Sequence, residues 1–156
     1  MQVVFGDTSK EMGQGVTHSF WERDGLTAVG ELKERPCRIL SLEDPTFRDG
    51  YLYFSLDPSF KKRKFSKAII DMDYCDIERG ILQLQYDAST PENEALTIIY
   101  SKLPRTVRLT GDKEWKKVTF EIPNPTFRNK QNGRSDFRFL VSPPKIAIGA
   151  ISVRLE

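Results

Sequence analysis

The sequence has little of the chemistry that enzymes usually need. Its 156 residues include one histidine, His18, and no more than two cysteines. A Ser-His-Asp or Cys-His catalytic arrangement would need His18 as its base, and a lone histidine in a glycine-rich segment is more often a plain polar loop residue. No nucleophile elbow, glycine-rich phosphate loop or metalloprotease helix motif occurs. These absences favour a protein that is not an enzyme.

Cysteine is too scarce for a disulfide scaffold, and the spacing of Cys37 and Cys75 matches no zinc motif. Two interpretations stay open. The thiols are buried as small hydrophobic groups, or they form a bridge in a secreted protein, because disulfides persist in oxidising compartments.

Long apolar runs are absent as well. None approaches the ~20 residues that a membrane span needs, so we expect no membrane partner. Residues 1–15 lack a charged start followed by an apolar core, which predicts no signal peptide in this chain. The chain is then either cytoplasmic or a module of a larger secreted protein whose export signal lies elsewhere.

No charge of one sign dominates the chain. Lys and Arg number 24 and Asp and Glu number 22, which gives a net charge of +2. A dedicated nucleic-acid-binding protein usually carries a denser basic stripe, so we expect no nucleic-acid partner. The one tight basic cluster, KKRK at residues 61–64, lies between strand-like segments and is interpreted as a solvated loop.

What the sequence does contain is a repeated β pattern without a long amphipathic helix. Apolar and polar residues alternate, which is typical of half-buried antiparallel strands. The expected strands are Gln2–Phe5, Leu26–Gly30, Arg38–Leu42, Tyr51–Leu56, Lys67–Asp76, Gly80–Tyr86, Val107–Leu109, Trp115–Ile122, Asp136–Val141 and Ala147–Leu155. Residues 89–100 stay open as a helical turn or an insertion. Short strands with turn signals between them predict an all-β, antiparallel β-sandwich in one domain, 1–156.

An amide-rich loop precedes the strand that begins at Asp136. Its polar side chains are Arg128, Asn129, Gln131, Asn132 and Arg134. Planar amide and guanidinium groups can hydrogen-bond sugar hydroxyls, and Arg128 and Lys130 would suit a uronic acid or a sulfated sugar. The alternative is a structural loop, because Asn, Gly and Asp often bond their own backbone in turns.

An aromatic platform and a sheet face are further candidate sites. Trp21 precedes a turn, where it is either a stacking surface for a sugar ring or a lid over one end of the core. Gln83, Gln85 and Arg138 alternate away from the apolar faces of their strands. The outward set also includes Asp71, Asp73 and Thr119. If these strands are neighbours, the set forms a polar surface for a glycan chain.

Carboxylates allow two other roles. Acids such as Asp71, Asp73 and Asp76 could serve a glycosidase as a pair, although 22 acidic residues make chance pairs common. Loop carboxylates could also hold a structural calcium ion, but no spaced calcium-loop motif occurs. We therefore expect no required cofactor and leave a structural calcium open.

Several segments together suggest a family. They are YLYFSLD (51–57), DYCD (73–76), GILQLQYD (80–87), WKKVTF (115–120), FRNKQNG (127–133) and DFR (136–138). Over roughly residues 35–156 the chain resembles the galactose-binding-domain-like β-sandwich modules attached to bacterial polysaccharide-degrading enzymes. The resemblance implies a jelly-roll fold, non-catalytic sugar binding and often a structural calcium. It also implies fold-keeping roles for Asp76, Asp87 and Asp136.

The sequence thus predicts a non-catalytic carbohydrate-binding module that recognises a polysaccharide and targets an attached catalytic domain to it. Its expected location is extracellular or periplasmic, within a larger secreted protein. The alternatives are a structural accessory sandwich that binds no sugar and a small jelly-roll glycosidase or polysaccharide lyase. The predicted carbohydrate-binding residues are Trp21, Gln83, Gln85, Arg128, Asn129, Gln131, Asn132, Arg134 and Arg138.

Overall fold

The computed structural model describes residues 1–5, 15–19 and 23–156, most of them in strands. The strands are β1 (Gln2–Val4), β2 (Val16–Ser19), β3 (Thr27–Leu32), β4 (Arg35–Ser41), β5 (Gly50–Leu56), β6 (Lys67–Asp76), β7 (Arg79–Tyr86), β8 (Ser101–Thr110), β9 (Trp115–Pro123), β10 (Phe137–Ser142) and β11 (Lys145–Leu155). Short helical turns are η1 (Phe60–Lys62), α1 (Leu96–Ile99) and η2 (Asn132–Arg134). Within the described ranges no helix is long and apolar enough to span a membrane.

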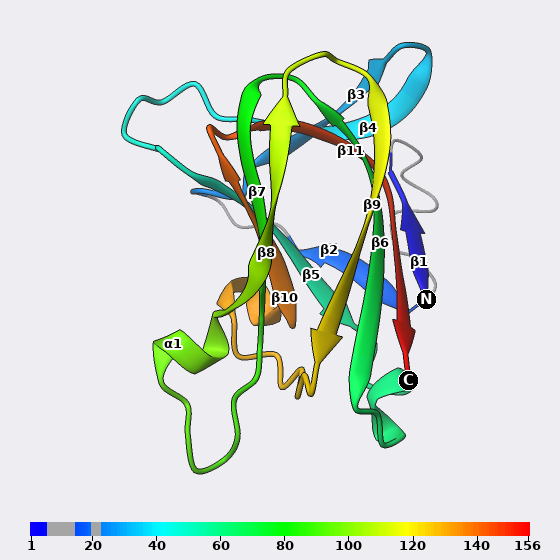
Figure 1. Ribbon diagram of the computed structural model, residues 1–156, viewed down its shortest axis with the longest axis vertical. Helices are drawn as coiled ribbons and strands as arrows, with labels where there is room; N and C mark the ends of the chain where they lie inside the picture. Colours follow the sequence, from blue (N-terminus) through cyan, green and yellow to red (C-terminus); the bar gives the residue numbers. More distant parts are fainter. Residues whose placement is uncertain (6–14, 20–22) are drawn as a thin grey trace.

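The strands form two sheets that pack face to face (Figure 1). Sheet A has the order β3-β4-β11-β6-β9, with β1 beside β11, and sheet B has the order β2-β5-β10-β7-β8. Every strand pair is antiparallel. The turn after β6 carries the chain from sheet A to sheet B, so strands adjacent in sequence often lie in different sheets. The predicted all-β antiparallel sandwich is confirmed.

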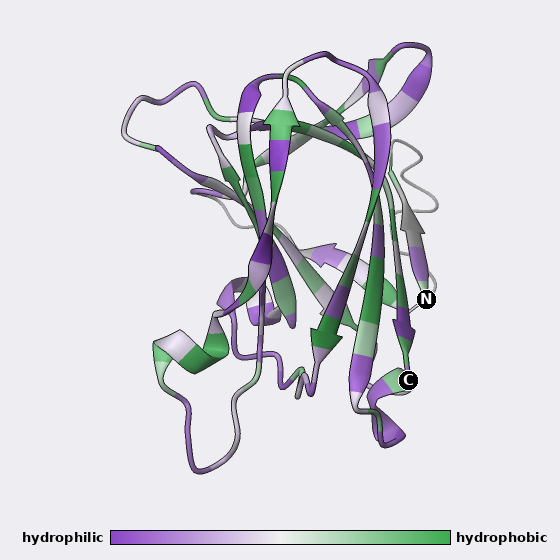
Figure 2. Cartoon of the chain, viewed as in Figure 1, coloured by the Kyte–Doolittle hydropathy of each residue, from purple (hydrophilic) through white to green (hydrophobic). Residues whose placement is uncertain are grey.

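The core lies between the sheets and follows from the alternation of side chains along each strand. Figure 2 shows hydrophobic and hydrophilic residues taking turns along the strands. In sheet B, Phe54 stacks on Phe137 with ring centroids 5.2 Å apart, and Phe137 meets Phe139 edge to face at 5.9 Å. Such aromatic pairs each contribute about 0.5–1.5 kcal/mol beyond the burial of their area. The inward face predicted for Lys67–Asp76 is confirmed by the burial of Ile70 and Met72.

A second, smaller apolar cluster lies on the outer side of sheet A. Cys37, Cys75 and Ala147 form its buried centre, and Trp115 packs against it. The indole Nε1 of Trp115 donates to the carbonyl of Leu32 at 3.2 Å. Burial raises the pKa of both thiols, and both cysteines are free and buried. Of the two interpretations, the structure therefore shows buried thiols.

The structure corrects the predictions at the N-terminal end and before β8. His18 lies in β2 and is buried, with its ring 5.7 Å from that of Phe5 and 5.3 Å from that of Phe54. Strand β2 has only four residues, too few for alternation to stand out. The open segment 89–100 contains α1, and β8 extends well beyond the expected Val107–Leu109.

Candidate functional site

Strand β5 directs two tyrosines to the side of sheet B that faces away from the core, where Tyr51 is half-buried and Tyr53 is fully buried. Leu52 and Phe54 are fully buried between the sheets. Because successive side chains on a strand point to opposite faces, Tyr51 and Tyr53 point outward. The sequence YLYF thus supplies core packing with every second residue and an outward aromatic pair with the others.

The strand register extends this pair into two rows of side chains across sheet B. The first row is Tyr53, Arg138, Gln85 and Lys102. The second row is Tyr51, Leu140, Gln83 and Thr106. Neighbouring strands lie about 4.8 Å apart, so side chains in one row are in contact range. We call the surface made by Tyr51, Tyr53, Gln83, Gln85, Tyr100, Asn132, Arg138 and Leu140 the tyrosine–arginine face.

Arg138 is the centre of this face. Its guanidinium carbon lies 3.9 Å from the ring centroid of Tyr51 and 3.9 Å from that of Tyr100. Its Nε donates to Oε1 of Gln85 at 2.7 Å, and its Nη1 donates to the hydroxyl of Tyr53 at 3.1 Å. Cation–π contacts contribute about 0.5–2 kcal/mol each, depending on how far the pair is desolvated. The guanidinium plane is therefore held in one orientation by four side chains.

A network of hydroxyl groups connects the face to the loop before β10. The Tyr53 hydroxyl donates to Oδ1 of Asp24 at 3.1 Å and accepts from Nδ2 of Asn132 at 3.5 Å. The Tyr100 hydroxyl accepts from the backbone N–H of Asn132 at 2.9 Å. Burial raises the pKa of Tyr53 to about 12 and also raises the pKa of Tyr51. The tyrosines thus stay neutral and keep their hydroxyl protons at physiological pH.

The face is bordered at both ends by connections that project from sheet B. In Figure 1 the connection between β4 and β5 extends to the left near the top, and α1 with the segment before it extends to the left near the bottom. A shallow groove of about 790 Å³ continues the face along β7 and β8. Its lining residues are Arg79, Gly80, Ile81, Thr106, Arg108, Leu109 and Thr110. The site is thus an open surface and not an enclosed pocket.

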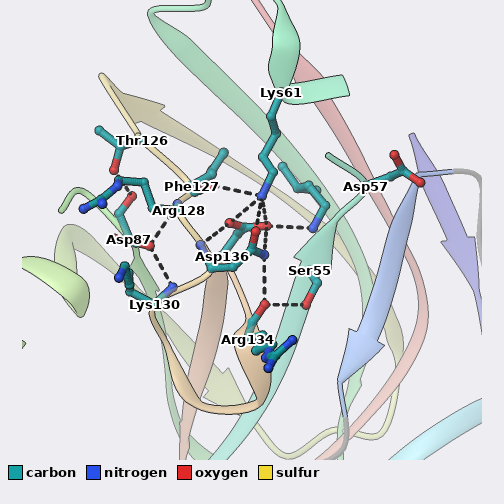
Figure 3. Close-up of polar contacts among 12 residues, drawn as sticks. Ser55, Asp57, Lys61, Asp87, Thr126, Phe127, Arg128, Lys130, Arg134 and Asp136 are labelled. Atoms are coloured by element: carbon teal, nitrogen blue, oxygen red, sulfur yellow. Dashed lines mark hydrogen bonds and ion pairs between the residues drawn. The ribbon is translucent and has the colours of Figure 1, made fainter. Parts of the chain in front are cut away.

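The loop between β9 and β10 is anchored by the buried carboxylate of Asp136 (Figure 3). That carboxylate accepts the backbone N–H of Leu56 at 2.8 Å and of Asn129 at 3.0 Å. The ammonium group of Lys61 lies 3.1 Å from both of its oxygens. It also donates to Oδ1 of Asn129 at 2.6 Å and to the carbonyl of Phe127 at 2.9 Å. Despite these donors, burial raises the pKa of Asp136 to about 6.

The Asp136 cluster is relevant to two predictions: a structural calcium ion, and a solvated loop at residues 61–64. Its oxygens are of the kind that calcium takes, but the Lys61 ammonium lies at their centre, so they do not fit a metal ion as arranged. Among the described residues, no group of three or more His, Cys, Asp or Glu side chains could hold one.

The solvated loop predicted for residues 61–64 is correct for Lys62, Arg63 and Lys64, which are exposed. It is wrong for Lys61, whose ammonium is buried against Asp136.

Asp87 holds the start of the same loop. Its Oδ2 accepts the backbone N–H groups of Arg128 and Lys130 at 3.0 and 3.1 Å, and its Oδ1 accepts that of Ser89 at 2.9 Å. Its carbonyl accepts the N–H of Phe127, whose φ of 48° is unusual for a bulky side chain. A backbone in this conformation persists only where its surroundings determine it. Asp87 supplies that constraint.

Asp76 makes a comparable cluster at the opposite end of the sandwich. Its buried carboxylate accepts from the hydroxyl of Thr110 at 3.0 Å and from the backbone N–H of Gly111 at 3.2 Å. Lys116 Nζ lies 3.0 Å from both carboxylate oxygens. The family resemblance implies fold-keeping roles for Asp76, Asp87 and Asp136. In agreement with this, each carboxylate accepts hydrogen bonds from other groups of the chain.

Four of the predicted site residues come together on the tyrosine–arginine face. Arg138 and Asn132 are half-buried, with the contacts described above, and Gln83 is half-buried in the second row. Gln85 is only 3 % exposed, so its amide orients Arg138 and does not itself face solvent.

The other predicted residues lie elsewhere. Arg128 pairs with Glu94 at 2.9 Å, and Asn129 belongs to the Asp136 cluster. Gln131 is buried, and its Nε2 donates to the carbonyl of Ile99 at 2.8 Å. Arg134 is exposed, and Trp21 lies outside the described residues.

The single polar surface expected from outward residues of several strands is divided between the two sheets. Asp71, Asp73 and Thr119 lie on β6 and β9 of sheet A, whereas Gln83 and Arg138 lie on β7 and β10 of sheet B. The condition for one continuous surface, that these strands are neighbours, is not met, because alternation gives the face of a strand but not the sheet to which the strand belongs.

The aromatic residues of the candidate site were not predicted from the sequence. Alternation along YLYF could have found Tyr51 and Tyr53, since both lie opposite the core positions of β5. Tyr100 had no such signal, because it follows α1 in the segment that was left open, and only the fold brings it to Arg138.

Comparison with known proteins supports the fold. No protein-family model and no curated protein sequence matches the chain. The CBM22-1 xylan-binding domain of Xyn10C from Paenibacillus barcinonensis matches with a TM-score of 0.62 and 12% identity, over 99% of this chain and 92% of that domain. A family 29 carbohydrate-binding module from Piromyces equi matches with a TM-score of 0.50 and 13% identity, over 90% and 81%. The chain thus has the β-sandwich fold of carbohydrate-binding modules, and the predicted resemblance is confirmed at the level of the fold.

Proposed function

We propose that the chain is a carbohydrate-binding module that recognises a polysaccharide on the tyrosine–arginine face and brings an attached catalytic domain to it. The observation that carries this proposal is the guanidinium of Arg138 held between Tyr51 and Tyr100 on an open sheet face. Sugars present apolar ring faces and rings of hydroxyl groups, so a site of aromatic rings with fixed planar donors is complementary to them.

The open shape supports a chain and not a small molecule as the ligand. Ligands that fill enclosed pockets bury most of their surface, whereas the groove along β7 and β8 is open to solvent. Each sugar unit would make few desolvated contacts, so we expect weak binding per unit and tighter binding by longer oligosaccharides. A module of this kind acts outside the cell or in the periplasm, as part of a larger secreted protein.

We propose no catalytic role. The acids considered for a glycosidase pair are engaged with cations, since Asp73 lies 2.7 Å from Arg35 and Asp71 lies 2.7 Å from Arg154. Asp76 is buried against Lys116. These contacts already occupy the carboxylates, whereas a glycosidase needs two carboxyl groups that can reach the glycosidic bond.

Affinity electrophoresis on a panel of neutral and acidic polysaccharides tests the proposal. The Tyr51→Ala variant should lose about 1–2 kcal/mol of binding free energy, roughly ten-fold in affinity, because Arg138 loses one of its two stacking partners. The matched control is Phe60→Ala, which removes a partly exposed aromatic ring on η1, away from this face. The control should bind like the parent protein.

Two results would contradict the proposal. If the parent protein is retarded by no polysaccharide, the chain is better explained as a structural accessory sandwich. If polysaccharides in the panel release reducing ends or unsaturated products, an enzyme explains the chain better.

A further inference from the structure

We infer that the polysaccharide is anionic, with carboxylate or sulfate groups along its chain. This inference rests on the proposed function, because it takes the tyrosine–arginine face as the glycan-binding surface. The inference specifies that the ligand is negatively charged. The fold and the aromatic rings alone do not specify the charge of the ligand.

The outward positions of sheet B carry cations without matching acids. Arg138 lies on β10, Arg79 on β7, and Lys102 and Arg108 on β8. At the described outward positions of β5, β7, β8 and β10 there is no Asp or Glu. Three carboxylates border the sheet: Asp24 accepts from the Tyr53 hydroxyl, Asp49 precedes β5, and Glu78 precedes β7. We call the four cations the sheet B cations.

None of the sheet B cations forms an ion pair within the part of the chain that the structure describes. Arg138 is the most telling member, because it is half-buried and its only hydrogen-bond partners there are the neutral Gln85 and Tyr53. Removing a cation from water without an opposite charge is unfavourable. Its Nη2 makes no hydrogen bond in the described structure, so an N–H donor remains for an oxyanion. Guanidinium groups match carboxylate and sulfate-like oxyanions well.

The spacing of the cations fits a chain with repeated charges better than one isolated anion. Arg138 and Lys102 flank Gln85 in one row, two strand spacings or about 10 Å apart. Arg108 pairs with Ile81, four residues along β7 from Gln85, which is about 13 Å. No single carboxylate can contact all of these groups at once, whereas a polymer that follows β8 can.

Polymers that share a backbone and differ in charge test the inference. We would measure binding by calorimetry to hydroxyethyl cellulose, carboxymethyl cellulose and cellulose sulfate, and to polygalacturonate and its carboxyl-reduced form. We expect tighter binding to an anionic member than to its neutral partner, and weaker binding at high ionic strength, because salt screens exposed charges. The carboxymethyl and sulfate forms distinguish the two kinds of anion.

A pair of substitutions that removes two positive charges from β8 locates the effect. Lys102→Gln with Arg108→Gln should lower affinity for the anionic polymers roughly three- to ten-fold and leave affinity for the neutral polymers unchanged. The matched control, Lys62→Gln with Lys64→Gln, removes the same charge from an exposed segment on another part of the surface. The control should retain the affinity of the parent protein.

The outcomes separate this inference from the proposed function. Equal binding to the anionic and neutral polymers of each backbone is consistent with glycan binding and overturns the anionic preference. Equal loss in the control pair would show unspecific charge attraction and would also overturn it. Binding to no member of any pair counts against the proposed function itself.

Discussion

On the outer face of sheet A, charged side chains meet one another. Asp71 lies 2.7 Å from Arg154, and Asp73 lies 2.7 Å from Arg35 and 3.6 Å from Lys117. On the outer face of sheet B, Arg138 meets two aromatic rings and two neutral polar groups. Both faces follow from the same alternation of polar and apolar residues. Outward polarity alone therefore does not identify a binding surface, and we propose that the half-buried, unpaired guanidinium of Arg138 does.

The loop beside the tyrosine–arginine face gives the largest expected effect. Asp136→Ala should lower the free energy of unfolding by about 3–5 kcal/mol at neutral pH, because it leaves the Lys61 ammonium buried without its partner. Urea unfolding measures this loss. The double variant Lys61→Met with Asp136→Ala should be more stable than the sum of the single effects implies. Additive losses would contradict the pairing seen in the structure.

This effect sharpens the comparison, since we propose that the loop supports the tyrosine–arginine face and does not itself contact the glycan. Asn132 reaches Tyr53 and Tyr100 only because the rest of the loop is held by Asp87 and Asp136. Losing that support should weaken glycan binding together with stability.

The same carboxylate predicts a pH dependence of stability. The pKa of Asp136 is raised from 3.8 to about 6 by burial, so protonation favours the folded state. Its stabilising contribution is present below about pH 4 and is lost as the pH rises through about 6, a change of about 3 kcal/mol. Unfolding measured from pH 4 to pH 7 should show this decrease, and Asp136→Asn should remove it. An unchanged pH profile in that variant would assign the titration to another group.

Substitutions of Arg138 test directly whether the outer face of sheet B binds the glycan. Arg138→Ala should reduce glycan binding by about 2 kcal/mol or more, because it removes the group that orients the rings and donates to the ligand. Arg138→Lys keeps the charge but loses the planar fork, so its binding should be intermediate. Calorimetry measures both, with thermal unfolding as the check that the sandwich is intact. Parent-like binding by Arg138→Ala would place the site elsewhere on the molecule.

A structural feature can be predicted from the sequence when it depends on residues that are close together along the chain. It is hard to predict when it depends on contacts between distant segments. In β6, β7, β9 and β10, the side of the sheet to which each side chain points follows from the alternation of apolar and polar residues. The structure agrees with this alternation. The assignment of strands to sheets depends on contacts between distant segments, which is why Asp71 and Gln83 were expected on one surface.

The site was predicted in part for the same reason. Gln83, Gln85 and Arg138 were found from local alternation, whereas Tyr100 reaches Arg138 across the fold. The amide-rich loop was misleading because turn-forming and sugar-binding residues are chemically alike. Only the hydrogen bonds of Asn129 and Gln131 show that these two amides hold the structure together.

The smallest expected effect lies on the outer face of sheet A. Arg154→Ala removes one exposed ion pair with Asp71, and such pairs contribute about 0.2–1 kcal/mol. The pKa of Asp71 is lowered first by the hydroxyl of Thr119 and then by Arg154, so we expect it to rise only partly toward its ordinary value. Titration followed by NMR measures this shift. Glycan binding should not change, because Arg154 and Asp71 are engaged with each other on sheet A, whereas the proposed site lies on sheet B. A loss of binding comparable to that of Arg138→Ala would mean that ligands use both faces, and the distinction between them would fail.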